Sequence, residues 1–300
     1  MKTTLSLIIF LFILIQNYAS PNNADHDSNI NKSSQMPGEA VRTILGTYAN
    51  PPRFKDGKVD ARRLISELKN LHANTYIWVI PPTHPEDWEA LKTFLPLAQK
   101  AKLNVWVSLR PPSEPPVPSP YGHNYEKWAV ELATLSLKEK CLVAWSIDDF
   151  SHNQKFFTLE YLGKVLAAAR AINPKFEFVP CCYYKAITPE FANSYKPLLN
   201  GILFPYRAES TGANLKDPGQ VENEIKKLRE LFGPEFKIYL DIYATAHSKL
   251  GATTPEYVKE VLATGRKTAD GVIIYKHQDP LISTDKYRII KDGFRRVNGK

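Results

Sequence analysis

Residues 142–150 read Leu-Val-Ala-Trp-Ser-Ile-Asp-Asp-Phe, a short apolar run that ends in two adjacent acidic residues. The run has the length and the β-branched and aromatic content of a buried strand. Seven further apolar runs of this kind, each followed by an amphipathic segment, occupy residues 42–48, 74–80, 104–110, 176–184, 201–207, 237–243 and 271–277. The sequence therefore contains eight candidate strands.

Helical patterns separate these strands. Within residues 60–71, for example, Leu64, Leu68 and Leu71 recur at spacings of four and three, the period of an amphipathic helix. Strands that alternate with helices pair in parallel through crossover connections. Eight such units predict an α/β fold, a single (β/α)8 TIM barrel, with a doubly wound open sheet as the main alternative. The chain has no Gly-rich phosphate-binding fingerprint, which disfavours the open sheet.

The N-terminus has the pattern of a targeting signal. Lys2 precedes a nearly unbroken apolar run at residues 5–15, and Asn-Tyr-Ala at residues 17–19 offers a small residue for cleavage. The run is too short to be a good membrane span. We expect a signal peptide over residues 1–20, with an uncleaved anchor as the alternative. The protein would then be exported, secreted or periplasmic, without stable membrane insertion after cleavage.

Composition describes the rest of the chain. Residues 21–39 are rich in Asn, Ser, Asp and Lys, which indicates a disordered linker, and residues 40–300 have the length of one barrel domain. The net charge is +8, from 39 Lys and Arg against 31 Asp and Glu. The lysines are scattered, so a solvated basic surface is favoured over a nucleic-acid partner. An attraction to acidic polysaccharide remains an open alternative.

Cysteine and histidine spacing argues against a metal centre or a cofactor. The chain has three cysteines, Cys141, Cys181 and Cys182, and their odd number argues against a disulfide framework. We expect buried thiols, because strand rise separates Cys141 from the other two by roughly 16 Å. No CxxC or HExxH pattern occurs. A metal-dependent deacetylase or phosphodiesterase is a minor alternative, suggested by the histidines expected near strand ends: His84, His123, His152, His247 and His277.

Polar or aromatic side chains end most of the candidate strands. In a barrel the carboxyl ends of the strands converge on one mouth, where active sites lie. Aromatic rings suit the apolar faces of sugar rings, and charged groups suit their hydroxyls. We therefore expect a carbohydrate substrate, bound by side chains at these strand ends: Tyr48, Trp78, Arg110, Tyr184, Tyr206, Arg207, Asp241, Tyr243, Lys276 and His277.

Strand alternation predicts which way the side chains of residues 142–150 point. The small and polar set should face the barrel interior: Ala144, Ser146 and Asp148. The bulky set should face the surrounding helices: Val143, Trp145 and Ile147. Asp148 would then point inward at the top of the fourth strand, and Asp149 could turn toward the mouth.

Two adjacent carboxylates in such a mouth cannot both ionise easily, so one pKa should rise. A raised carboxyl is what a general acid needs near neutral pH, while its neighbour stays charged. The plainer alternative is that the Asp residues cap the following helix. Asp241 at the end of the seventh strand offers a second mechanism, because many glycosidases use two separated carboxylates. Alternatively, Asp241 binds sugar hydroxyls or forms a salt bridge with Lys276 or Arg207.

The predicted barrel, with Asp148 and Asp149 ending its fourth strand, resembles a glycoside hydrolase barrel. The acidic pair is similar to that of the substrate-assisted N-acetylhexosaminidases, the O-GlcNAcase-like family. This resemblance implies that Asp148 orients the substrate acetamide, whose oxygen attacks the anomeric carbon, and that Asp149 protonates the leaving oxygen. The alternative function is a non-catalytic carbohydrate-binding barrel, which an Asp148 side chain held in a salt bridge would favour.

Overall fold

The structure is a computed structural model that describes residues 43–81, 84–275, 281 and 283–295. Arg42–Lys300 forms one compact unit. The expected signal peptide and linker lie outside the described residues, as do Lys276 and His277. Among the helices in the described ranges, none combines the length and the apolar character needed to cross a membrane.

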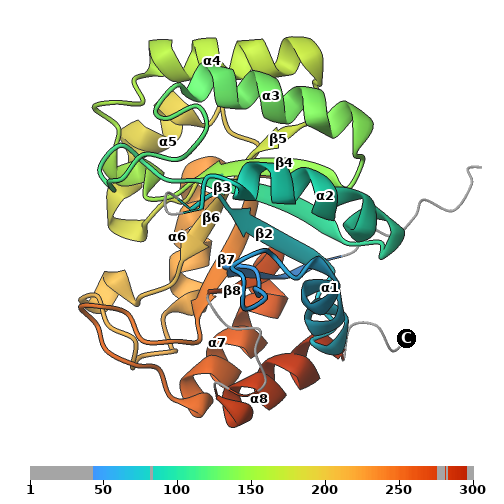
Figure 1. Ribbon diagram of the computed structural model, residues 1–300. Coiled ribbons are helices and arrows are strands. Elements are labelled where there is room, and N and C mark those ends of the chain that lie inside the picture. The colour runs from blue at the N-terminus through green and yellow to red at the C-terminus, as the bar shows by residue number, and fades with distance from the viewer. Residues whose placement is uncertain (1–42, 82–83, 276–280, 282, 296–300) are drawn as a thin grey trace, which may run out of the picture. The chain divides into compact units, whose positions relative to one another are not determined.

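Parallel strands and helices alternate along the described chain, as Figure 1 shows. The strands are β1 (Ile44–Ala49), β2 (Thr75–Val79), β3 (Asn104–Leu109), β4 (Leu142–Ile147), β5 (Glu177–Phe178), β6 (Gly201–Pro205), β7 (Lys237–Tyr243) and β8 (Gly271–Tyr275). The helices are α1 (Ala61–Asn70), α2 (Asp87–Lys100), α3 (Tyr125–Lys138), α4 (Leu159–Ile172), α5 (Pro189–Tyr195), α6 (Val221–Phe232), α7 (Pro255–Thr268) and α8 (Thr284–Arg295). The prediction of a single (β/α)8 barrel is confirmed.

The strands pair in the order β5-β4-β3-β2-β1-β8-β7-β6, so closure depends on the seam between β5 and β6. There, β5 is short, and Pro180 has no N–H to extend a regular ladder. Backbone hydrogen bonds continue the pairing instead. Asn200 N donates to Phe178 O at 3.0 Å, Leu203 N to Pro180 O at 2.9 Å, and Cys182 N to Leu203 O at 2.9 Å. The sheet is therefore a nearly closed barrel.

Two apolar layers fill the barrel domain. Inside the barrel, Trp106 on β3 and Tyr239 on β7 meet edge to face with ring centroids 5.0 Å apart. Outside it, the opposite faces of the strands pack against the helices; Trp145, for example, is fully buried in this outer layer. Because successive strand residues point to opposite sides, the inner and outer layers alternate along each strand.

Strand β4 departs from the expected alternation at its start. Val105 pairs with Leu142 but Trp106 pairs with Ala144, so Val143 is an unpaired bulge residue. The prediction that Val143 faces the helices is wrong, because the bulge turns it toward the interior layer, against which it packs. From Ala144 onward the predicted alternation holds, with Ala144 inside and Trp145 outside.

The three cysteines are free and buried. Cys141 donates from Sγ to Leu95 O at 3.3 Å, in the outer layer. Burial raises the pKa of its thiol to about 11. Cys181 and Cys182 lie at the β5–β6 seam, consistent with the expected separation from Cys141.

Two glycines give opposite predictions for alanine substitution. A Cβ on Gly271 would lie 2.7 Å from Ile44 Cβ and 2.8 Å from Ile44 O, where β8 meets β1. We expect Gly271→Ala to lower the free energy of unfolding by about 1–3 kcal/mol, because the strand backbones must move apart. In α4, a Cβ on Gly163 would meet nothing within 4 Å. Gly163→Ala should raise stability by about 0.5–1 kcal/mol.

Urea unfolding of the two variants, followed by circular dichroism, measures both changes. Similar effects from the two substitutions would show that the β1–β8 contact is not as tight as the structure has it.

Candidate active site

A cavity of about 610 Å³ opens at the carboxyl ends of the strands. Six of the side chains predicted to lie at this mouth line the cavity: Tyr48, Asp148, Asp149, Arg207, Asp241 and Tyr243. They come from the ends of β1, β4, β6 and β7, which are far apart in sequence. The barrel is thus what brings them together.

A left-handed turn at Asp149 aims both adjacent carboxylates at this cavity. Consecutive strand residues normally point to opposite faces. Here Asp149 has φ 45° and ψ 29°, a conformation that Asp tolerates better than most residues. Its N–H donates to Asp148 Oδ1 at 3.0 Å, and its side chain makes no capping hydrogen bond to the following 3₁₀ turn, η1 (Phe150–His152). The structure therefore does not support helix capping as the role of the pair.

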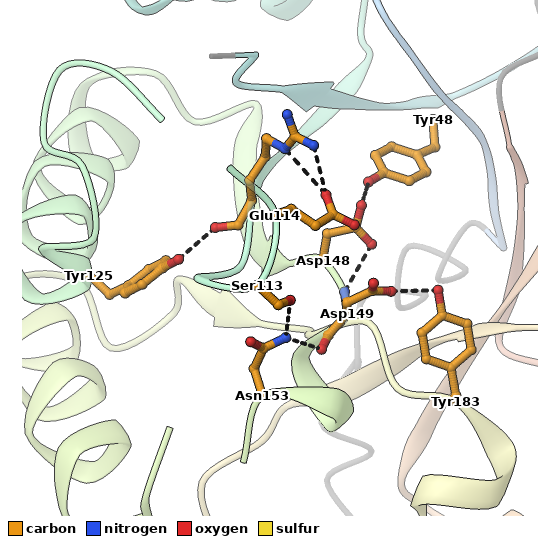
Figure 2. A network of polar contacts seen from close by, with 9 residues as sticks. Tyr48, Ser113, Glu114, Tyr125, Asp148, Asp149, Asn153 and Tyr183 are labelled. Atoms are coloured by element: carbon orange, nitrogen blue, oxygen red, sulfur yellow. Dashed lines mark hydrogen bonds and ion pairs between the residues drawn. The ribbon is translucent and has the colours of Figure 1, made fainter. Parts of the chain in front are cut away.

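Asp148 is held at both carboxylate oxygens. The Tyr48 hydroxyl donates to Oδ2 at 2.5 Å, while Oδ1 accepts from the Asp149 N–H (Figure 2). Burial and, after it, the charge of Asp149 raise the pKa of Asp148 to about 6, against the lowering effect of the Tyr48 hydrogen bond. No described cation forms a salt bridge with Asp148. One pKa of the pair is therefore raised, as expected.

Asp149 is held at one oxygen only. The Tyr183 hydroxyl donates to its Oδ1 at 2.6 Å, as Figure 2 shows. Asn153 Nδ2 donates to the Asp149 carbonyl oxygen at 2.9 Å and to Ser113 Oγ at 3.0 Å, which fastens the turn to the loop after β3. Among the described residues, Asp149 Oδ2 has no hydrogen-bond partner. This oxygen is therefore available to a molecule in the cavity.

A chain of contacts supports Tyr183 from behind. The Arg207 guanidinium lies over the Tyr183 ring, 4.0 Å from its centroid. Arg207 in turn forms an ion pair with Glu209, whose side chain is buried and also accepts from Lys185 N at 2.7 Å. The ring of His152 also stacks on the Tyr183 ring, with centroids 4.5 Å apart. Tyr183 is consequently fixed in the position from which it contacts Asp149.

Asp241 contributes a third carboxyl to the cavity. Its side chain is 2% exposed, and Oδ1 has no hydrogen-bond partner among the described residues. Burial raises the pKa of Asp241 well above its ordinary value, and the nearby Asp148 adds to the shift. Arg207, which was considered as a salt-bridge partner, pairs with Glu209 instead. Asp241 therefore lies in the cavity as a buried carboxyl group whose surroundings favour its uncharged form.

One group of described residues has ligand atoms close enough for a metal ion. Asp148, Asp149 and Cys181 place a carboxylate oxygen or the thiol sulfur within 4.8 Å of one another. Burial raises the pKa of the Cys181 thiol far above its usual range, and the charges of Asp148 and Asp149 raise it further. A thiol binds metal as the thiolate. The group is therefore a poor match for a zinc site, which usually combines thiolates with imidazoles.

Three predicted binding residues do not line the cavity, and their placement corrects the sequence-based assignment. Trp78 is fully buried in the outer layer, with its ring 5.2 Å from that of Phe94. Tyr206 is also in the outer layer and donates to Asp217 O at 2.7 Å. Tyr184 begins the 3₁₀ turn η2 (Tyr184–Ala186) and packs against the outer layer. Alternation explains all three, because each adjoins a residue that faces inward.

Arg110 is not among the residues that line the cavity, but its partner is. Arg110 Nη2 forms a salt bridge with Glu114 at 3.0 Å, and Glu114 lines the cavity from the proline-rich loop after β3. Lys276 and His277 were also predicted as binding residues, and they lie outside the described residues.

Sequence analysis missed several lining residues. Tyr183 and Tyr275 line the cavity, and each is the inward-facing neighbour of a predicted binding residue. Strand alternation, which places Tyr239, Asp241 and Tyr243 on one face, is the signal that identifies them. Glu114 and Lys249 reach the cavity from loops, where no periodic pattern predicts direction. Cys181 was regarded only as a buried thiol.

The raised pKa of Asp148 makes a prediction for stability. Its folded-state pKa of about 6 lies above the ordinary value of 3.8, so the folded protein binds more protons than the unfolded chain between these limits. The free energy of unfolding should therefore fall as pH rises from about 4 to about 6. Asp148→Asn stays uncharged and keeps an acceptor for Tyr48. We expect it to gain about 1–3 kcal/mol over the wild type across this window.

Urea unfolding at a series of pH values measures this difference, with the exposed Asp292→Asn as the matched control. Wild type and Asp148→Asn curves that stay parallel across the window would contradict the raised pKa.

Comparisons with known proteins support the fold. No protein-family model and no curated protein matches the chain. Among solved structures, a GH18 chitinase from Pseudoalteromonas aurantia superposes with a TM-score of 0.57 at 12% identity, covering 82% of this chain and 98% of the chitinase. A family 39 glycoside hydrolase from Bacteroides cellulosilyticus gives 0.58 at 12% identity, with coverages of 86% and 64%.

A β-glucuronidase from Dictyoglomus thermophilum gives a TM-score of 0.57 at 14% identity. The alignment covers 86% of this chain but 51% of the glucuronidase, so this chain spans about half the length of that enzyme. At these identities the likeness concerns the fold alone. The chain has the barrel fold that these glycoside hydrolases share.

Proposed function

We propose that the protein is a glycoside hydrolase in which Asp149 is the general acid and Asp148 its orienting partner. The observation that carries this proposal is the unequal engagement of two neighbouring carboxylates on one cavity. Asp148 has both oxygens occupied by Tyr48 and the Asp149 N–H, whereas Asp149 has one oxygen free toward the cavity. A group that must reach a glycosidic oxygen needs a free oxygen of this kind.

The raised pKa of Asp148 lets this site hold a proton up to about pH 6. Double ionisation is disfavoured because the two carboxyls are adjacent and Asp148 is half-buried, so that loss of hydration and the charge of Asp149 together raise the pKa of Asp148. Asp149 presents its Oδ2 to the leaving oxygen and would deliver the proton there, while Asp148 keeps its contact with Tyr48. This division assigns delivery to Asp149 and orientation to Asp148.

For the sugar, we propose an N-acetylhexosaminide cleaved with assistance from its own acetamide group. Asp148 would hold the acetamide so that its oxygen attacks the anomeric carbon as the bond to the leaving oxygen breaks and Asp149 protonates that oxygen. Asp149, now ionised, would then take a proton from the water that opens the cyclic intermediate. Three tyrosine rings provide apolar surface for a sugar ring. The ring centroid of Tyr275 lies 5.3 Å from that of Tyr48 and 5.1 Å from that of Tyr243.

Asp241 offers a second catalytic mechanism. It lies on the same cavity with a buried oxygen that has no hydrogen-bond partner among the described residues, so it could act with Asp148 or Asp149 as a separated carboxylate pair.

The proposed export rests on the apolar run at residues 5–15 that follows Lys2. N-terminal sequencing of the protein recovered outside the cytoplasm tests it, since cleavage near residue 20 is expected.

The two assigned roles predict different losses. Asp149→Asn should lower kcat/KM by about 10²–10⁴-fold on glycosides with poor leaving groups, because general acid catalysis is removed. An activated aryl glycoside needs less protonation and should lose less. Asp148→Asn should damage both substrates alike, because it disturbs the attacking acetamide. The measurement is the kinetics of aryl N-acetylhexosaminides and plain aryl hexosides with graded leaving groups.

Asp292→Asn, on α8 and away from the cavity, is the matched control and should match the wild type. If activity is present and neither cavity variant reduces it, the assigned roles are wrong and Asp241 becomes the leading carboxylate. If the wild type turns over no glycoside in the panel but binds sugar, the protein is a carbohydrate-binding barrel.

A further inference from the structure

Three nitrogen-bearing side chains line the cavity from the side of β6 and β7. Arg207 follows the end of β6, and His247 and Lys249 belong to the loop after β7. The ring of His247 lies edge-on to Tyr243, with centroids 5.4 Å apart. We refer to Arg207, His247 and Lys249 as the donor wall.

The loop that carries His247 and Lys249 is folded on itself. His247 N donates to Gly251 O at 2.9 Å, and Gly251 N donates back to His247 O at 3.1 Å. The His247 ring joins this turn, since its Nδ1 accepts from Lys249 N at 3.0 Å and from Leu250 N at 3.2 Å. The imidazole is therefore part of the loop's internal structure.

These hydrogen bonds determine the tautomer of His247. An Nδ1 that accepts two N–H groups uses its lone pair, so the ring proton is on Nε2. Burial lowers the pKa of His247, and the charges of Arg207 and Lys249 lower it further, which favours the neutral ring. His247 can therefore offer the cavity only a donor, its Nε2–H.

Arg207 offers the cavity a donor in a fixed direction. Its Nε and Nη2 both donate to Glu209 Oε1. Its guanidinium plane is held over the Tyr183 ring. Within the described part of the chain, Nη1 has no hydrogen-bond partner. Lys249, which is exposed at the rim, is likewise a donor without acceptor capacity.

A wall of donors alone favours one kind of ligand group. A sugar hydroxyl both donates and accepts, so its own proton finds no acceptor on these three side chains. A carboxylate or a sulfate only accepts, and its hydrogen bonds to cationic donors are about twice as strong as neutral ones. Glu209 offsets the charge of Arg207, which leaves Lys249 as the source of net positive charge on the wall.

We propose that the donor wall binds an anionic substituent, a carboxylate or a sulfate, carried by the sugar that occupies the cavity. This inference rests on the proposed function, because it names the substrate class of the same site. It refines that function from a sugar in general to one with a negatively charged group, on the cleaved unit or on its neighbour.

Binding measurements test the proposal without relying on turnover. We would titrate D-glucuronate against D-glucose, and glucose 6-sulfate against glucose, into wild type by isothermal calorimetry at low salt. The acidic partner of each pair should bind about tenfold more tightly. The first pair reports a carboxylate and the second a sulfate, so the two sources of anion are distinguished.

Charge variants then locate the preference. Lys249→Ala should reduce the ratio of the two dissociation constants severalfold, and Lys249→Glu should abolish or reverse it. Both changes are at an exposed loop position, so folding is not at risk. Lys259→Ala, on exposed α7 surface away from the cavity, is the matched control and should keep the wild-type ratio.

Equal affinity for both members of each pair, no binding of any of the three sugars, or a preference that survives in Lys249→Glu would overturn the proposal. The proposed hydrolase activity fails separately. Neutral and acidic aryl glycosides hydrolysed with equal kcat/KM would leave the glycosidase intact and remove the anionic preference. Tight binding of the acidic sugars without hydrolysis of any glycoside would keep the anionic preference and contradict the proposed hydrolase activity.

Discussion

A parallel sheet has two edges of unpaired backbone groups unless it closes on itself, and this barrel closes through the seam between β5 and β6. Pro180 interrupts regular pairing there, and single backbone hydrogen bonds across to β6 replace it. The same short segment carries Cys181 and Tyr183 to the cavity. Tyr183 can hold Asp149 only because the seam places it next to the end of β4.

The turn at Asp149 is the second constraint on the site. Without a left-handed residue there, Asp149 would follow the strand and face the helices, and only Asp148 would reach the cavity. The two carboxylates on this cavity then differ in their surroundings. Asp148, engaged at both oxygens, has its pKa raised to about 6, whereas Asp149 Oδ2 has no hydrogen-bond partner in the described part of the chain. This asymmetry lets one fold position supply two different chemical roles.

The cavity is chemically divided. Carboxyl groups approach it from β4 and β7, and the three side chains of the donor wall approach it from the ends of β6 and β7. Tyr183 links the two parts, because it donates to Asp149 and lies under the Arg207 guanidinium. A substitution at Arg207 would therefore affect two things. It would disturb the position of Asp149 through Tyr183, and it would weaken the binding of a ligand at the donor wall.

Local patterns in the sequence were enough to predict the barrel and the importance of residues 142–150. Eight apolar runs separated by amphipathic segments, a local pattern, were sufficient for the fold, and the acidic pair was visible as an interruption of one run. Alternation also contained more information than was used, since it separates Tyr183 from Tyr184 and Arg207 from Tyr206. Alternation fails at Val143, because the bulge there arises from the pairing of β4 with β3 and has no local sequence signal.

The hydrogen-bond partners of the carboxylates depend on how the chain folds in three dimensions. Tyr48 is a hundred residues from Asp148 in sequence, and Glu114 and Lys249 reach the cavity from loops without any periodic pattern. Burial, which sets the pKa values of Asp148 and Asp241, depends on the whole surrounding shell of atoms. Local patterns determine elements because backbone geometry is local, whereas hydrogen-bond partners and desolvation are properties of atoms that meet only after the chain has folded.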